Sequence, residues 1–167
     1  AVMVVLILVL TYVFLPENVK PDPHISLRPA PMTSNFVSIV KNTTFFTYTI
    51  TTSFTFGGLS VYLAGSTVIL LDRFKVSPAF YAILFALQSI GLIVGNQLNI
   101  MMLKRYSSTK LFSAAVTLQM LSSVVFLIGC YFDWYGIYST ILFFFILLAC
   151  LGMTFPNGSA AALAPFT

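Results

Sequence analysis

Charged residues are scarce in this chain: of its 167 residues only 7% are Asp, Glu, Lys or Arg, whereas soluble proteins average roughly 25%. Instead, 59% of the residues are apolar and the mean hydropathy is +0.98. So little charge excludes an ordinary soluble domain and predicts an integral membrane protein, with the lipid bilayer as its partner. The net charge of +4 does not indicate nucleic-acid binding, because the cations lie in short segments between apolar runs.

Residues that do chemistry in enzymes are almost missing. The single histidine, His24, falls in a Pro-rich segment, and Cys130 and Cys150 lie inside apolar runs without the spacing of metal ligands. The four acids are expected in loops or at membrane interfaces: Glu17, Asp22, Asp72 and Asp133. We find no pattern for a buried carboxylate pair, a nucleophile with its base or a phosphate-binding loop. The chain is therefore predicted not to be an enzyme and to hold no metal and no cofactor.

Five apolar runs predict an all-α, polytopic transmembrane helix bundle. At a rise of about 1.5 Å per residue, a run of 20 or so residues crosses the roughly 30 Å hydrocarbon layer. The expected spans are residues 42–71, 79–103, 111–131 and 139–163, preceded by the end of another span at residues 1–15. Residues 16–41 form a polar, Pro-rich linker, whose last part, residues 33–41, is expected to be an interfacial helix. Because the chain opens inside an apolar run without Met, we expect it to be part of a longer protein.

Lysine and arginine set the expected orientation. If the loop after residue 103 is cytoplasmic, alternation of the spans places six cations inside and two outside. The inner set is Lys20, Arg28, Lys41, Lys104, Arg105 and Lys110, and the outer set is Arg73 and Lys75. This excess agrees with the preference for positive charge on the cytoplasmic side.

The expected spans carry amides and hydroxyls but no ionisable residue, although proton-coupled carriers generally need one inside the membrane. Either the coupling group lies in a missing part of the protein, or the chain is a channel or a structural subunit. Tyr48, Thr52 and Thr55 share one helix face, which fits packing against other helices or a cavity for amphiphilic molecules. Gln88 and Asn96 need partners at depth, either a substrate or another helix. The candidate substrate-binding residues are Tyr48, Thr52, Thr55, Gln88 and Asn96.

Other residues are predicted to have structural roles. Gly91 and Gly95 form a GxxxG pair, which favours close helix packing. Pro156 predicts a kink in the last span, and the Asn157 amide is expected to bond the backbone carbonyl that this proline leaves free. Asn99 is expected to bond the following loop.

Three stretches resemble a known family: FTYTITTSFTFGGLSVYLAGSTVILLDRFKVSPAFYAILFAL, FALQSIGLIVGNQLNIMMLKRYSSTKLF and GMTFPNGSAAALAPF. Together they resemble the Bcr/CflA-type drug-resistance transporters of the major facilitator superfamily, which are drug:proton antiporters of the bacterial inner membrane. The basic loop from Lys104 to Lys110 departs from the superfamily motif, because Ser107 and Ser108 stand where a glycine is expected.

The resemblance implies a twelve-helix fold in two halves. Residues 1–15 would end helix six, residues 16–41 would form the central cytoplasmic loop, and residues 42–167 would form helices seven to ten. The acids that carry protons would lie in the missing N-terminal half, and the proton gradient would drive transport. We therefore expect proton-driven efflux of small amphiphilic compounds. The alternatives are an uptake permease of the same superfamily for a sugar or nucleoside, and a non-transporting membrane subunit.

Overall fold

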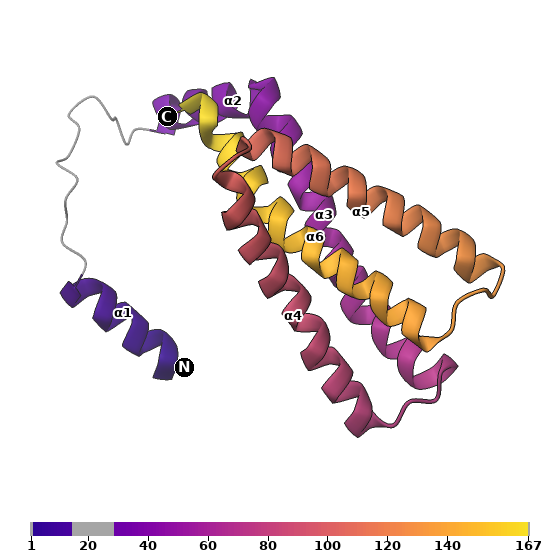
Figure 1. Cartoon of the computed structure of the whole chain (residues 1–167). Coiled ribbons are helices and arrows are strands. Elements are labelled where there is room, and N and C mark those ends of the chain that lie inside the picture. The colour runs from indigo at the N-terminus through magenta and orange to yellow at the C-terminus, as the bar shows by residue number, and fades with distance from the viewer. Residues whose placement is uncertain (1, 15–28, 167) are drawn as a thin grey trace. The chain divides into compact units, whose positions relative to one another are not determined.

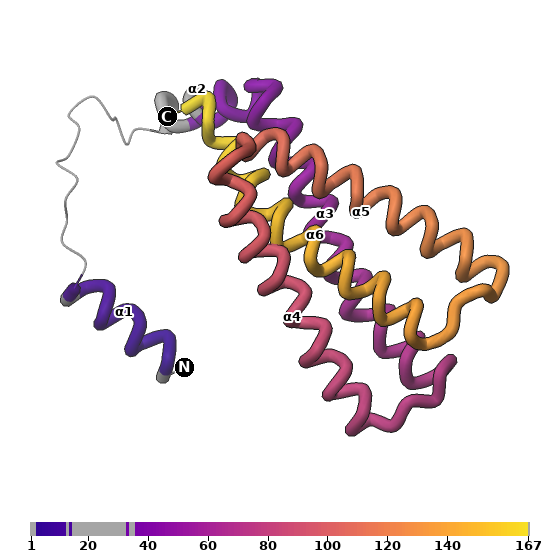
Figure 2. Tube along the Cα trace, viewed as in Figure 1, coloured from indigo at the N-terminus to yellow at the C-terminus, as the bar shows by residue number. Residues whose placement is uncertain are grey.

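The computed structural model describes residues 2–14 and 29–166, and every regular element in these two ranges is a helix (Figures 1 and 2). The all-α transmembrane fold predicted from the sequence is confirmed. The chain divides into two compact units, Ala1–Ser38 and Ile39–Thr167. The first half of the Pro-rich linker, with Glu17, Lys20, Asp22, His24 and Arg28, lies outside the described residues.

Two short helices precede the main bundle in the sequence. α1, Val2–Phe14, is wholly apolar apart from Thr11 and Tyr12, and its 13 residues cover about 20 Å, less than the hydrocarbon layer. α2, Pro29–Lys41, begins four residues before the predicted interfacial helix. Its early start follows from Pro29, since a proline is well tolerated in the first turn of a helix.

Four longer helical segments make up the second unit, and each is long and apolar enough to cross a membrane. They are α3 (Thr43–Thr67) continued by the π-helical turn η1 (Val68–Arg73), α4 (Pro78–Leu103), α5 (Ser108–Tyr131), and α6 (Ile137–Leu163) continued by the 3₁₀ turn η2 (Ala164–Phe166). The chain is therefore a multi-pass membrane protein. The bounds differ from the predicted spans by no more than three residues at each end.

Side chains fix where two of these helices begin. The Asn42 side chain accepts a hydrogen bond from the Phe45 backbone N–H at 3.1 Å, and so caps α3. Ser77 does the same for the N–H of Phe80 at 3.3 Å, with Pro78 at the first helical position of α4. Both caps satisfy backbone donors that would otherwise be unpaired at the helix start.

The last span, α6, packs against each of the other three spans (Figure 1). Its side chains Phe144, Leu148 and Leu151 form the buried core together with Tyr62 of α3. Towards α4 the contact is so close that a Cβ atom at Gly95 would overlap the carbonyl oxygen of Ala149. A Cβ at Gly91 would lie 2.9 Å from the carbonyl oxygen of Phe145. The two glycines therefore let the α4 backbone approach α6.

At one end of the bundle, two connections are joined by side chains. Arg73, after α3, forms an ion pair with Asp133, in the connection between α5 and α6. The Tyr135 hydroxyl donates to the carbonyl oxygen of Val125 at 3.1 Å, and its ring occupies the space that a side chain at position 129, a glycine, would need. These contacts fasten the α5–α6 connection to α5 and to the end of η1.

Candidate functional site

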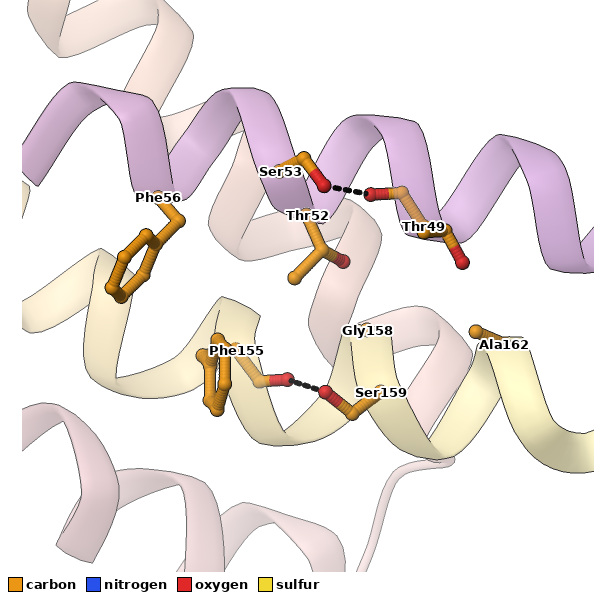
Figure 3. A pocket seen from close by; sticks show the side chains of 8 residues that line it. All are labelled: Thr49, Thr52, Ser53, Phe56, Phe155, Gly158, Ser159 and Ala162. Atoms are coloured by element: carbon orange, nitrogen blue, oxygen red, sulfur yellow. Dashed lines mark hydrogen bonds between the residues drawn. The ribbon is translucent and has the colours of Figure 1, made fainter.

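A pocket of about 290 Å³ opens between α3 and α6, and we call it the α3–α6 pocket (Figure 3). Each helix presents one face to it. The α3 side consists of Thr49, Thr52, Ser53 and Phe56. The α6 side consists of Phe155, Gly158, Ser159 and Ala162, which recur at the three- and four-residue spacing of a single helix face.

The hydroxyls of the pocket differ in how they are satisfied. Ser53 donates to the carbonyl oxygen of Thr49 at 2.8 Å, and Ser159 donates to that of Phe155 at 2.9 Å, as the dashed lines in Figure 3 show. Thr52 Oγ1 is buried and has no hydrogen-bond partner among the described residues. It lies against Gly158, where an added Cβ would overlap it. Because that oxygen is covered, the hydroxyls that a ligand in the pocket can reach are those of Thr49, Ser53 and Ser159.

Two phenyl rings form an apolar wall beside these hydroxyls. The ring centroids of Phe56 on α3 and Phe155 on α6 are 5.8 Å apart, and both rings are exposed. Aromatic surface next to a few hydrogen-bonding groups is the usual lining of a small-molecule site. The lining side chains offer hydroxyls and aromatic surface, which suit the binding of a small molecule.

A longer depression runs between α3 and α5, and we call it the α3–α5 groove. It consists of two hollows of about 400 and 710 Å³, and Val116 lines both. Tyr48 lines the smaller hollow, where its ring meets that of Phe112 edge-on at 5.1 Å between centroids. Thr55 lines the larger hollow, and its hydroxyl donates to the carbonyl oxygen of Thr52 at 2.8 Å.

Gln88 lies in the interior and lines none of these pockets. It is only 1% exposed, and its Oε1 accepts a hydrogen bond from the Tyr62 hydroxyl of α3. Its Nε2 has no partner among the described residues. The sequence left two interpretations of Gln88, a substrate contact and a hydrogen bond between helices. The structure shows a hydrogen bond between helices, because Tyr62 belongs to α3 and Gln88 to α4.

The five candidate residues are not brought together. Thr52 lies in the α3–α6 pocket, Tyr48 and Thr55 lie in separate hollows of the α3–α5 groove, and Gln88 is buried between α3 and α4. Asn96 is exposed on α4, outside all three pockets. They separate because α6 packs against the hydroxyl-bearing face of α3 and divides it.

A network of amides joins three helices near the start of α5. Asn157 donates through Nδ2 to Asn99 Oδ1 at 2.5 Å and to the Met153 carbonyl oxygen at 2.8 Å, and its Oδ1 accepts from Ser108 Oγ at 2.9 Å. Two predictions are corrected here. Asn99 bonds α6 rather than the following loop. Pro156 has no N–H to donate to the carbonyl oxygen of Gly152, four residues earlier. The Asn157 amide was expected to bond that carbonyl, but it bonds the carbonyl oxygen of Met153 instead.

Pro156 itself lies inside α6 and does not end it. The helix continues to Leu163, so the residues on both sides of the proline belong to one element. This continuity places Phe155 and Ser159 on the same wall of the α3–α6 pocket.

The sequence alone did not identify the α6 side of the pocket. The spacing of Phe155, Ser159 and Ala162 was available, but nothing in it shows that this face meets α3. Among the described residues no group of His, Cys, Asp or Glu could hold a metal ion. Compared with family models, curated proteins and solved structures, the chain has no match.

Proposed function

We propose that the chain is part of a proton-driven efflux transporter for small amphiphilic compounds. The observation that carries this proposal is the α3–α6 pocket, in which two exposed phenyl rings lie beside the accessible hydroxyls of Thr49, Ser53 and Ser159. Such a lining favours molecules with an apolar body and a few polar groups, because the rings bury the apolar body and the hydroxyls pair with the polar groups.

The pocket is small for a complete substrate site. Its volume of about 290 Å³ stands at the lower end of the range for small-molecule pockets. In a major facilitator arrangement, the site lies between two halves, and each half supplies part of it. We therefore propose that α3–α6 are helices seven to ten of a twelve-helix protein of the bacterial inner membrane.

The apolar stretches of the four spans lack acidic, basic and histidine side chains, which bears on coupling. Residues 43–71, 78–103, 111–131 and 137–166 contain no Asp, Glu, Lys, Arg or His. A proton-coupled cycle needs such a group at depth. On this proposal the N-terminal half supplies it, while the spans described here supply substrate contacts.

Efflux from living cells tests the proposal. The full-length protein is produced in bacteria that lack their own drug pumps, and retention of the amphiphilic dye ethidium is measured with and without a protonophore. We expect the protein to lower retention, the protonophore to restore it, and Thr49→Val, which removes an accessible hydroxyl of the pocket, to weaken export about tenfold at subsaturating dye. Thr67→Val is the matched control, because Thr67 lies on the same helix outside the α3–α6 pocket.

Two results would contradict the proposal: unchanged retention, or equal export by the two variants. Higher retention in producing cells would indicate an uptake permease instead. No change for any of a panel of amphiphiles would favour a non-transporting subunit.

A further inference from the structure

The α3–α5 groove changes character along its length. The smaller hollow lies beside the N-terminal turns of α3 and α5 and is rich in exposed hydroxyls, namely Thr43, Thr44, Thr47, Ser113 and Thr117. The larger hollow continues from Val116 and is walled by exposed apolar side chains such as Phe54, Val61, Met120 and Leu127. A polar head and a long apolar body are thus joined in one depression.

Two lysines that do not line the smaller hollow lie close in the sequence to residues that do. Lys41 lies two residues before Thr43, and Lys110 lies three residues before Ser113 and seven before Thr117, on one side of α5. Both lysines are exposed. The dipole at the start of α5 adds to the attraction for an anion.

No acid opposes this charge within the described residues. The two acids of the second unit lie at the opposite end of the bundle: Asp72 is in η1, and Asp133 is in the α5–α6 connection. The polar end of the groove is therefore electropositive and hydroxylated, which is the chemistry that recognises a phosphate group.

We infer that the α3–α5 groove binds an anionic phospholipid, with its phosphate between Lys41 and Lys110 and one acyl chain in the larger hollow. The larger hollow extends along α5 from Val116 to Cys130, a length of about 21 Å. One hydrocarbon leaflet is roughly 15 Å thick, so the hollow is long enough to hold an acyl chain. A free phosphate would leave this apolar surface uncovered. The inference does not depend on the proposed transport activity.

Photochemical labelling tests where the lipid lies. The full-length protein is purified, placed in nanodiscs of phosphatidylcholine, and exposed to phosphatidylglycerol with a diazirine in its acyl chain. We expect labelled peptides from α5 around Val116 to Leu127 and from α3 around Phe54 to Val61. Val116→Trp, which narrows the passage between the two hollows, should abolish this labelling.

Charge variants test the headgroup. Replacing both Lys41 and Lys110 with Gln should weaken phosphatidylglycerol binding about 30-fold, at roughly fivefold per lysine. Replacing Lys104 and Arg105 with Gln is the matched control, because it removes the same charge from the same end of the bundle. Binding in this control should stay within about threefold. Gel filtration of each variant establishes that it is folded.

Four outcomes would overturn the inference. Labels spread evenly over the lipid-facing helices would mean that the groove holds no particular lipid. No label in the groove would mean that a protein helix covers it. Equal losses in the two double variants would reduce the effect to surface charge, and competition by glycerol phosphate alone would identify a free-phosphate site.

Discussion

At position 95 the absence of a side chain is a packing requirement. A Cβ there would overlap the Ala149 carbonyl oxygen, and a backbone atom in the middle of a helix cannot move aside cheaply. We expect Gly95→Ala to lower the free energy of unfolding by roughly 1–3 kcal/mol. In detergent, the exposure of the buried Cys150 thiol to a fluorogenic maleimide reports unfolding.

Gly65→Ala is the control for this substitution. Nothing lies within 4 Å of a Cβ at Gly65, so alanine should be neutral or stabilise α3 by up to about 1 kcal/mol. Equal melting of the two variants would contradict the close contact between α4 and α6.

Asn157 is the second position where a single side chain matters, because it bonds α4, α5 and its own helix. Hydrogen bonds between transmembrane helices average about 0.6 kcal/mol each. Asn157→Leu should therefore destabilise the protein by about 1–2 kcal/mol in the same thiol assay. Asn96→Leu should change little, because Asn96 is exposed. A larger effect at Asn96 would show that its surface is covered in the complete protein.

The sequence predicted packing or hydrogen-bonding roles for these residues, but it could not identify the residues that they contact. A GxxxG pair predicts close packing with some helix, and an amide at depth predicts a hydrogen bond to something. The actual partner of Asn99 is 58 residues away in the chain. No local pattern encodes a contact over that distance.

At the scale of elements, α3 shows how a single face is divided by its neighbours. Tyr48, Thr52 and Thr55 lie on one side of the helix, as their spacing predicted. Yet Tyr48 meets α5, Thr52 meets α6, and Thr55 lines the larger hollow of the groove. The helix period fixed the face, and the packing of α5 and α6 fixed what each residue contacts.

The connection between α5 and α6 depends on backbone conformation more than on charge. Asp133 has a φ of 56°, which Asn and Asp adopt more readily than other side chains, and its ion pair with Arg73 is largely exposed. Asp133→Asn should therefore cost no more than about 0.5 kcal/mol, whereas Asp133→Ala should cost about 1 kcal/mol more.

Unfolding measured at low and high salt separates the two effects of Asp133. The small difference between the native protein and Asp133→Asn should vanish at high salt, because salt screens an exposed ion pair. The difference between the Asn and Ala variants should persist. If both variants lose equal stability, the ion pair rather than the backbone holds this connection.

At the scale of the whole molecule, charge separates the two ends of the second unit. Lys41, Lys104, Arg105 and Lys110 lie at one end, while Arg73 and Lys75 lie at the other together with two acids. We predict that the first end faces the cytoplasm. In cells producing the full-length protein without Cys130 and Cys150, an impermeant maleimide should label Asp72→Cys from outside. It should label Ser107→Cys only after permeabilisation, and the reverse pattern would refute the orientation.

The sequence by itself determined that this is a helical membrane protein and where its spans begin and end. These properties follow from local physics: uninterrupted apolar runs must hydrogen-bond internally in lipid, and charges, prolines and capping residues end them. Only the tertiary structure decided that α6 contacts all three other spans and that Thr52 faces Gly158. It also decided that Tyr48, Thr52 and Thr55 line three different pockets, while Gln88 and Asn96 line none of them. Which helix faces meet depends on the shapes of surfaces that are far apart in the chain. Lipid tails are as apolar as the surface of a neighbouring helix, so hydrophobicity alone does not select the partner of a helix.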